Sequence, residues 1–176
     1  MGHLVLVGMM GSGKTSVGEL VAERLGRPLV DSDAVIEART GRTVREIFEA
    51  EGEAAFRTLE SDALAEALAA PAPAVVAAAG GVVLDGANRA LLQGEGDGDG
   101  VSVITVVWLD ADPSVLAARV EKGDHRPLLG DDPEAALVRL DRERRPLYQE
   151  VADHRVDVSG QDLAEVAEAV LALVPA

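Results

Sequence analysis

Short apolar runs alternate with amphipathic segments along the whole chain. The runs are rich in Val, Leu and Ala, as expected for strands that are covered on both faces, whereas in the segments between them apolar residues recur every three or four positions, as in helices. Alternating strands and helices without a long linker predict one α/β domain over residues 1–176, with three layers and a five-stranded parallel sheet. The predicted strands are 4–7, 27–30, 74–79, 101–110 and 154–158.

Start and stop signals place the helices between these strands. Gly26 and Gly41 are typical of helix ends, and Thr43 with Glu46 predicts a capping box at the start of another helix. Pro146 is expected to kink or break the helix that contains it. The predicted helices are 14–25, 33–40, 44–52, 53–69, 85–92, 113–123, 132–151 and 162–173.

The turn after the first strand carries the most specific chemical motif. Residues Gly8 to Thr15 match GxxxxGK[ST], and the match lies between a predicted strand and a predicted helix, which is the context that this motif requires. The alternative is an ordinary glycine-rich turn. Backbone N–H groups of such a loop and the helix N-terminus bind phosphate, the lysine reaches the β and γ phosphates, and the threonine hydroxyl binds magnesium. The expected nucleotide-binding residues are Gly11, Ser12, Gly13, Lys14, Thr15 and Ser16.

Composition and charge narrow the possible partners. With no cysteine and three scattered histidines, the chain is expected to use a metal held by oxygen atoms. A net charge of −15 argues against binding to nucleic acid or to an anionic membrane. No apolar stretch approaches the length of a membrane span and no leader is evident, so we expect a cytoplasmic protein.

Two aspartates follow the second predicted strand. Asp31 and Asp33 would lie at the carboxyl end of a parallel sheet, where ligands bind, so they are candidates for magnesium and for a phosphate acceptor. The alternative is that Ser32 or Asp33 only caps the next helix.

A possible anion clamp lies farther along. Arg57 and Glu60 form an i,i+3 pair, and Phe48 and Phe56 flank the arginine, which would suit a carboxylate on a small apolar ring. A solvent-exposed ion pair beside two core phenylalanines is the alternative. Gly80–Gly81, after the third strand, would let the backbone approach a ligand or would form a plain turn.

Two further segments are interpreted as a lid and a surface loop, and the histidines as structural or exposed. Residues 122–131 are polar and bounded by glycine, as is typical of a mobile lid, with Arg126 as its arginine. Residues 94–100 lack calcium-binding spacing and are read as a surface loop. The histidines are assigned no chemical role: His3, His125 and His154.

Taken in order, these motifs resemble the shikimate kinases over nearly the whole chain. The matching segments are GMMGSGKTSVG, DSD after the second strand, FRTLE, a glycine pair after the third strand, RPLL in the lid and RRPLY before the fifth strand. The resemblance implies transfer of the ATP γ-phosphate to the 3-hydroxyl of shikimate. Analogy with small phosphate-loop kinases gives the strand order 2-3-1-4-5, and we expect a monomer that binds ATP and shikimate.

The resemblance also implies residue roles, with a shikimate-binding segment at about 33–61. Lys14 would contact the phosphates, Thr15 and Asp31 would hold Mg²⁺, and Asp33 would contact the acceptor hydroxyl as orienter or base. The implied acceptor and lid contacts are Arg57 and Arg144 on the carboxylate, Glu60 orienting Arg57, Phe48, Phe56, Gly80 and Gly81 in the pocket, Arg126 on the transferred phosphate and Arg119 on adenine.

One position departs from the family pattern. Most shikimate kinases have three consecutive glycines after the third strand, and here Ala79 replaces the first. A methyl group pointing into the core would cost little, whereas a positive φ at position 79, or a place against the acceptor ring, would weaken acceptor binding or shift the choice of acceptor.

Three other classes are less consistent with the motifs. A gluconate kinase would not need the two separated arginines of FRTLE and RRPLY. A nucleoside monophosphate kinase would need base-recognition segments and a longer lid. A non-catalytic ATP-binding module would be expected to lack Lys14, Asp33 or Arg126, all of which are present.

Overall fold

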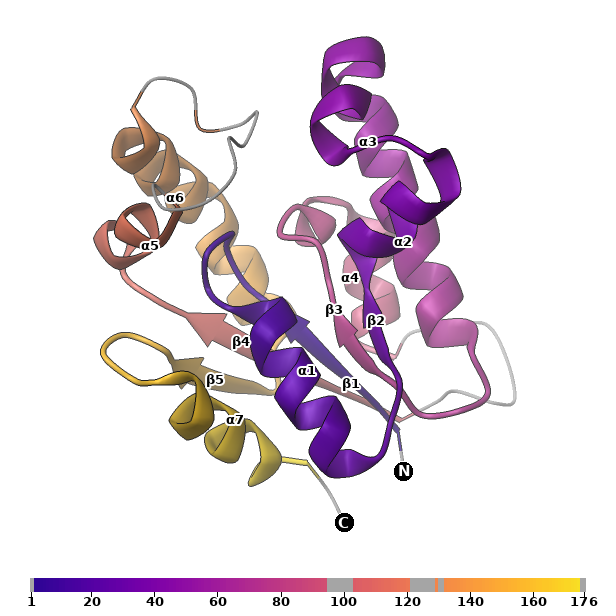
Figure 1. The fold of residues 1–176 in the computed structure, drawn as a ribbon, viewed down its shortest axis with the longest axis vertical. Helices are drawn as coiled ribbons and strands as arrows, with labels where there is room; N and C mark the ends of the chain where they lie inside the picture. Colours follow the sequence, from indigo (N-terminus) through magenta and orange to yellow (C-terminus); the bar gives the residue numbers. More distant parts are fainter. Residues whose placement is uncertain (1, 95–102, 121–128, 130–131, 175–176) are drawn as a thin grey trace.

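The computed structural model describes residues 2–94, 103–120, 129 and 132–174. Within them, five strands form a single parallel sheet in the order β2-β3-β1-β4-β5, as predicted (Figure 1). The central strand β1 pairs with β3 on one side and with β4 on the other. The strands are β1 (His3–Val7), β2 (Leu29–Asp31), β3 (Val75–Ala77), β4 (Ile104–Asp110) and β5 (His154–Asp157).

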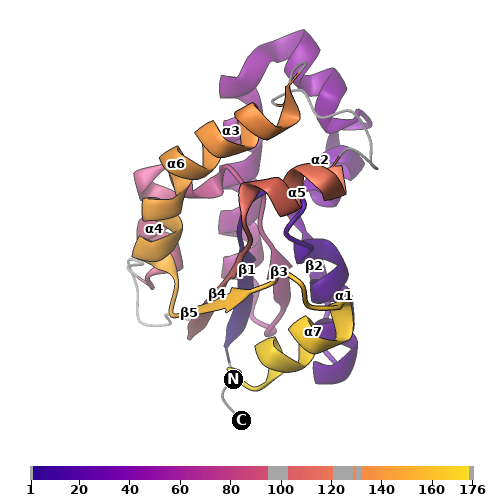
Figure 2. The same cartoon turned by 90° about the vertical axis from the view of Figure 1, so that its left-hand side faces the viewer.

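Helices cover both faces of this sheet. Figure 2, which views the sheet from its edge, shows α1 and α7 on one face and α4 and α6 on the other. The helices are α1 (Lys14–Leu25), α2 (Ser32–Thr40), α3 (Val44–Ala69), α4 (Gly86–Leu92), α5 (Pro113–Val120), α6 (Pro133–Val151) and α7 (Leu163–Leu171), with a short 3₁₀ turn η1 (Val82–Leu84). Among the described residues, no helix is long and apolar enough to cross a membrane.

The predicted strands were generally too long. β3 is shorter than 74–79, and the fourth strand begins at Ile104 rather than at residue 101, where the chain lies outside the described residues. The register explains the first difference, because β3 is paired only where β1 and β2 run beside it, from Val75 to Ala77.

One helix prediction is confirmed and one needs correction. The two helices expected at 44–52 and 53–69 are present as the two parts of α3, which meet at Gly52, where the backbone is not helical (φ 82°, ψ 176°). Pro146 does not end α6, which continues to Val151. The missing N–H costs one helical hydrogen bond, but Tyr148 and Val151 beyond it are buried, and their packing keeps the last turn helical.

The apolar core lies on both sides of the sheet. Every residue of β1 is buried, as are nearly all residues of β4, which fits their central position. A second, smaller cluster joins α2 to α3 beyond the carboxyl ends of the strands; its buried members are Ile36, Ile47, Phe56 and Ala63. This cluster holds the α2–α3 segment as a rigid wall beside the sheet edge where ligands bind in parallel α/β folds.

A buried aspartate ties two later elements to β4. Asp110 is 4 % exposed and accepts hydrogen bonds from Arg145 of α6 (Nη2–Oδ1, 2.8 Å) and Arg155 of β5 (Nε–Oδ2, 2.8 Å). The two guanidinium groups also flank the Trp108 ring, with Cζ 5.1 Å and 5.3 Å from its centroid. One carboxylate therefore fixes how α6 and β5 sit against β4.

We expect Asp110→Ala to lower the free energy of unfolding by about 2–3 kcal/mol, because it leaves two arginines without their shared buried acceptor. The partial exposure of Arg145 and Arg155 limits the loss. Urea denaturation followed by circular dichroism measures it. The matched control is Glu168→Ala, which removes the exposed Arg24–Glu168 pair and should cost less than about 0.5 kcal/mol. Equal losses in the two variants would contradict the assigned role of Asp110.

Candidate active site

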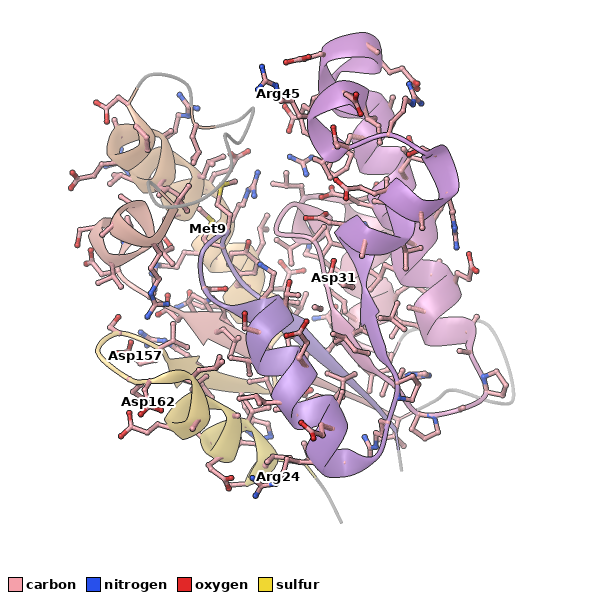
Figure 3. All side chains as sticks on the ribbon, viewed as in Figure 1. Met9, Arg24, Asp31, Arg45, Asp157 and Asp162 are labelled. Carbon is pink, nitrogen blue, oxygen red and sulfur yellow. The ribbon has the colours of Figure 1, made fainter. Side chains whose placement is uncertain are left out.

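A pocket of about 340 Å³ opens at the carboxyl ends of the strands. Figure 3 shows its setting, with Met9 in the loop after β1 and Asp31 at the end of β2 on the same edge of the sheet. The residues that line it come from the phosphate loop and the start of α1, the end of β2, α2, α3, the end of β3 with the segment after it, and α6: Met10, Gly11, Gly13, Lys14, Thr15, Ser16, Asp31, Asp33, Val44, Phe48, Phe56, Arg57, Glu60, Ala77, Ala78, Ala79, Gly80, Gly81 and Arg144.

The phosphate loop forms one end of the pocket. Its glycines Gly8, Gly11 and Gly13 all have positive φ, between 80° and 146°, which a residue with a Cβ rarely adopts. The curled backbone brings its carbonyl groups within reach of Lys14, whose Nζ donates to Gly8 O (2.9 Å) and Met9 O (3.1 Å). The ammonium group is thereby held over the loop where phosphates would bind.

A hydroxyl and a carboxylate meet beside this loop. Thr15 Oγ1 donates to Asp31 Oδ2 (2.6 Å), and Asp31 Oδ1 accepts from the Ala34 N–H, which makes Asp31 the N-cap of α2. The expected alternative, a cap by Ser32 or Asp33, is wrong, because the cap lies one residue earlier. Asp31 combines capping with a place beside Thr15.

These oxygen donors fit a hard divalent cation. Magnesium prefers oxygen ligands and takes one or two of them from the protein, with the rest from phosphates and water. Among the described residues, no group of three or more His, Asp or Glu side chains gathers to bind a metal by itself. The pair Thr15–Asp31 therefore suits an ion that arrives with a nucleotide rather than an ion bound by protein alone.

Arg57 lies at the other end of the pocket between two carboxylates and two rings. Its Nη1 donates to Glu60 Oε2 (2.6 Å) and its Nη2 to Glu53 Oε1 (2.6 Å). The rings of Phe48 and Phe56 lie 4.7 Å apart, each about 6 Å from the guanidinium carbon. The side chain of Arg57 is 20 % exposed, so it is a partly buried group on the pocket wall and not a solvent-exposed ion pair.

Burial shifts the titration of this pair. The pKa of Glu60 is raised above its ordinary value because the carboxyl is buried, although the charge and hydrogen bond of Arg57 oppose the shift. Burial would lower the pKa of Arg57, but Glu60 and Glu53 together raise it. The guanidinium is therefore a permanent positive charge whose direction Glu60 fixes.

Arg144 enters the pocket from α6, far from Arg57 in sequence. It is 2 % exposed, and within the described part of the chain its Nε has no hydrogen-bond partner. A buried, partly unsatisfied guanidinium on a pocket wall is suited to receive an anion.

The glycine pair after β3 lies between the two arginines. A Cβ at position 81 would overlap Arg57 Nη1, and a Cβ at position 80 would stand 3.6 Å from Arg144 Nη1. Glycine is needed here for close approach, since neither residue has positive φ. Ala79 is 7 % exposed, and no non-glycine residue described has positive φ, so the alanine is accommodated without backbone strain.

Behind the pocket, Tyr148 is completely buried and donates its hydroxyl to Gly80 O (2.6 Å). Burial raises the pKa of Tyr148 to about 12, although the charge and hydrogen bond of Arg144 lower it. The phenol is therefore protonated, and a donor, throughout the neutral range.

Two described residues predicted for the site, Ser12 and Arg119, do not line the pocket. Ser12 is buried, and its Oγ has no partner among the described residues. Arg119 donates to Gly11 O (3.3 Å) and Val158 O (3.0 Å), so it braces the phosphate loop from the side of α5. Arg126 lies outside the described residues, as does the lid at 122–131 apart from Leu129, which is buried.

Sequence reasoning missed four pocket residues: Met10, Val44, and Ala77 and Ala78 at the end of β3. Met10 belongs to the phosphate loop, where the motif leaves its type open. Val44 precedes Phe48 by one helical turn, and that spacing could have indicated a shared face.

Neither of the two described histidines lines this pocket. His3 is buried and serves the fold, since its ring contacts Ala70 O (3.1 Å) and accepts from the Ala74 N–H. His154 is exposed on β5. His125 and most of the acidic loop at 94–100 lie outside the described residues.

Comparison with known proteins identifies a family. The family model described as "Shikimate kinase" matches residues 10–175. A shikimate kinase of Symbiobacterium thermophilum is 46 % identical over 172 residues, covering 96 % of this chain and 94 % of the relative. The structure of Acinetobacter baumannii shikimate kinase in complex with shikimate matches with a TM-score of 0.89 and 37 % identity, over 98 % of this chain and 92 % of that one.

A solved structure from a rival class is less similar. A gluconokinase of Sinorhizobium meliloti matches with a TM-score of 0.58 and 26 % identity, over 97 % of this chain and 90 % of that one. The two structures therefore share the architecture, and the overall similarity to the shikimate kinase is greater.

We expect the free energy of unfolding to fall between about pH 10 and pH 12 because of Tyr148. Its pKa is raised in the folded protein, so the unfolded chain releases the phenolic proton first and gains stability as the pH rises. The contribution is complete below about pH 10 and amounts to about 2–3 kcal/mol, two pKa units at 1.36 kcal/mol each.

Tyr148 is the chain's one tyrosine, so tyrosinate absorbance reports its titration directly. Denaturant unfolding across this pH range should show a steeper decline for the wild type than for Tyr148→Phe. Parallel declines, or a tyrosine that ionises at its ordinary pH in the folded protein, would contradict the assigned environment.

Proposed function

The chain belongs to the shikimate kinase family, and we propose that it transfers the γ-phosphate of ATP to the 3-hydroxyl of shikimate. One observation carries the proposal: a single pocket is lined at one end by a phosphate loop with Lys14 and at the other by Arg57 and Arg144. The first end suits a nucleotide triphosphate. The second suits a carboxylate on a compact ring, because two arginines from separate helices approach it beside two phenylalanine rings.

At the nucleotide end, we assign the phosphates to the loop backbone and to Lys14, and Mg²⁺ to Thr15 directly and to Asp31 through water. Magnesium bound there would neutralise charge on the phosphate oxygens. Gly11, Ser12, Gly13 and Ser16 would contribute N–H groups and the N-terminus of α1. Arg119, which braces Gly11, would pack on adenine, and Arg126 would neutralise the transferring phosphate.

At the acceptor end, Arg57 and Arg144 would bind the shikimate carboxylate. Glu60 accepts a hydrogen bond from Arg57 Nη1 and so fixes the orientation of the guanidinium group. Phe48 and Phe56 would pack on the apolar part of the ring, and the small Gly80 and Gly81 leave space for it beside the arginines.

Asp33 lies between the two ends, on the first turn of α2 and on the pocket wall. A carboxylate there can accept a hydrogen bond from the hydroxyl to be phosphorylated and turn its oxygen toward the phosphate. Because the transition state of phosphoryl transfer is loose, positioning and charge neutralisation supply most of the catalysis, so orientation is the main role that we assign to Asp33.

The function is tested by ATP turnover, measured as coupled ADP release. We expect strong stimulation by shikimate and none by gluconate or a nucleoside monophosphate, because only shikimate presents a carboxylate and a hydroxyl on a compact ring. Stimulation by another acceptor, or by none while ATP still binds, would overturn the assignment.

We expect Arg57→Ala to raise the KM for shikimate about 100-fold, the equivalent of 2–3 kcal/mol for a charge-assisted ionic contact, and to leave the KM for ATP nearly unchanged. Steady-state kinetics with each substrate varied in turn measures both. Arg45→Ala is the matched control, since Arg45 lies on the same helix in an exposed pair with Glu49 (Figure 3). An unchanged shikimate KM in Arg57→Ala would remove this residue from the carboxylate site.

We expect Gly81→Ala to raise the KM for shikimate as well, by at least about tenfold, because the added methyl group must displace the guanidinium of Arg57. Ala79→Gly is the matched control: it should alter the KM less than about twofold, since position 79 needs no positive φ. The same assay measures both variants. A larger effect at position 79 than at position 81 would contradict this account of the loop.

A further inference from the structure

Tyr148 lies directly behind the acceptor end of the pocket without lining it. It follows Arg144 by one turn of α6, so the two side chains share a face of the helix. Both are almost completely buried, at 0 % and 2 % exposure. The mechanism above assigns no role to the tyrosine, although a buried phenol must satisfy its hydroxyl group.

The tyrosine makes two contacts that limit its movement. Its hydroxyl donates to Gly80 O (2.6 Å), and its ring stacks on Trp108 with centroids 5.8 Å apart. The positive charge of Arg144 also acts on the phenolic oxygen. The hydroxyl therefore joins α6 to the glycine loop after β3.

Gly80 extends this connection to the phosphate loop. A Cβ at position 80 would stand 3.3 Å from Gly8 O, 3.6 Å from Arg144 Nη1 and 3.7 Å from Met10 N. The glycine is thus packed between the loop that would hold ATP and the arginine that would hold the acceptor carboxylate.

We propose that the Tyr148 hydroxyl is a positioning group for the acceptor, which fixes Arg144 and the Gly80 backbone in the geometry that binds the shikimate carboxylate. The inference rests on the proposed function and deepens it. Arg144 needs such a group because within the described residues its Nε has no hydrogen-bond partner, and the Gly80 backbone that Tyr148 holds lies against its guanidinium.

Removing the hydroxyl changes two groups together. Tyr148→Phe keeps the ring on Trp108 but leaves the Gly80 carbonyl without this donor, and it takes the polar oxygen away from Arg144. The Gly80 backbone can then shift, and with it the guanidinium that lies against it. The two arginines that would bind the shikimate carboxylate then lose their relative arrangement, while the phosphate loop keeps its own hydrogen bonds to Lys14.

The test compares Tyr148→Phe with Val151→Ala. Val151 is buried on the same helix, 4 % exposed, and lines no part of the pocket, so truncating it lowers stability without touching Gly80 or Arg144. We expect Tyr148→Phe to raise both the KM and the calorimetric Kd of shikimate about tenfold, the effect of one lost buried hydrogen bond, with the KM for ATP unchanged. Val151→Ala should leave all three near wild type.

A second measurement does not depend on the acceptor. Hydrogen exchange of the backbone amides at 79–84 should be faster in Tyr148→Phe than in Val151→Ala, because only the first variant releases the Gly80 carbonyl.

The outcomes separate this inference from the proposed function. A wild-type protein that neither binds nor responds to shikimate overturns the function. A shikimate-dependent wild type with an unaltered Kd in Tyr148→Phe, or an equal rise in Val151→Ala, overturns the role of the hydroxyl.

Discussion

A buried arginine that binds a ligand must be held by some of its donors while others stay available, and this constraint organises the acceptor end of the pocket. Arg57 meets it with carboxylates, since Glu60 and Glu53 take two of its nitrogens. Arg144 meets it differently: it lies against the Gly80 backbone that the neutral phenol of Tyr148 holds, and its Nε has no partner in the described structure. The two arginines therefore differ in how much of their charge is already compensated, and Arg144 retains more of its charge for an incoming anion.

The same constraint explains how a chain of net charge −15 can present a cationic site. Several arginines outside the pocket are compensated one by one, as in the exposed Arg24–Glu168 and Arg45–Glu49 pairs. Such pairs contribute little stability but keep positive charge from attracting anions elsewhere. In the pocket, the cations that can bind an anionic ligand are Lys14 of the phosphate loop and the two arginines, which come from distant segments of the chain.

The sequence predicted what depends on periodicity and on local motifs. The strand order was confirmed, and the phosphate loop has the predicted place between β1 and α1, because glycine spacing and apolar runs act over a few residues.

The sequence could not predict contacts that depend on how distant segments pack. Tyr148 and Gly80 are 68 positions apart, and no local pattern links them. Asp31 was considered for metal but not as a cap, because DSD offers three possible caps. Whether Ala79 is tolerated depended on its φ angle, which only the backbone of the folded chain defines.

The rotation of α6 about its own axis connects these observations. Arg144 and Arg145 are neighbours in sequence, so on a helix their side chains point about 100° apart. Arg145 is held by Asp110 at the end of β4 and Tyr148 by Gly80 after β3, so the helix is fixed on two sides to two different strands. Rotation in either direction would break one of these contacts. The direction in which Arg144 enters the pocket is therefore set by its neighbours on the helix, which are themselves held by residues at the ends of β3 and β4.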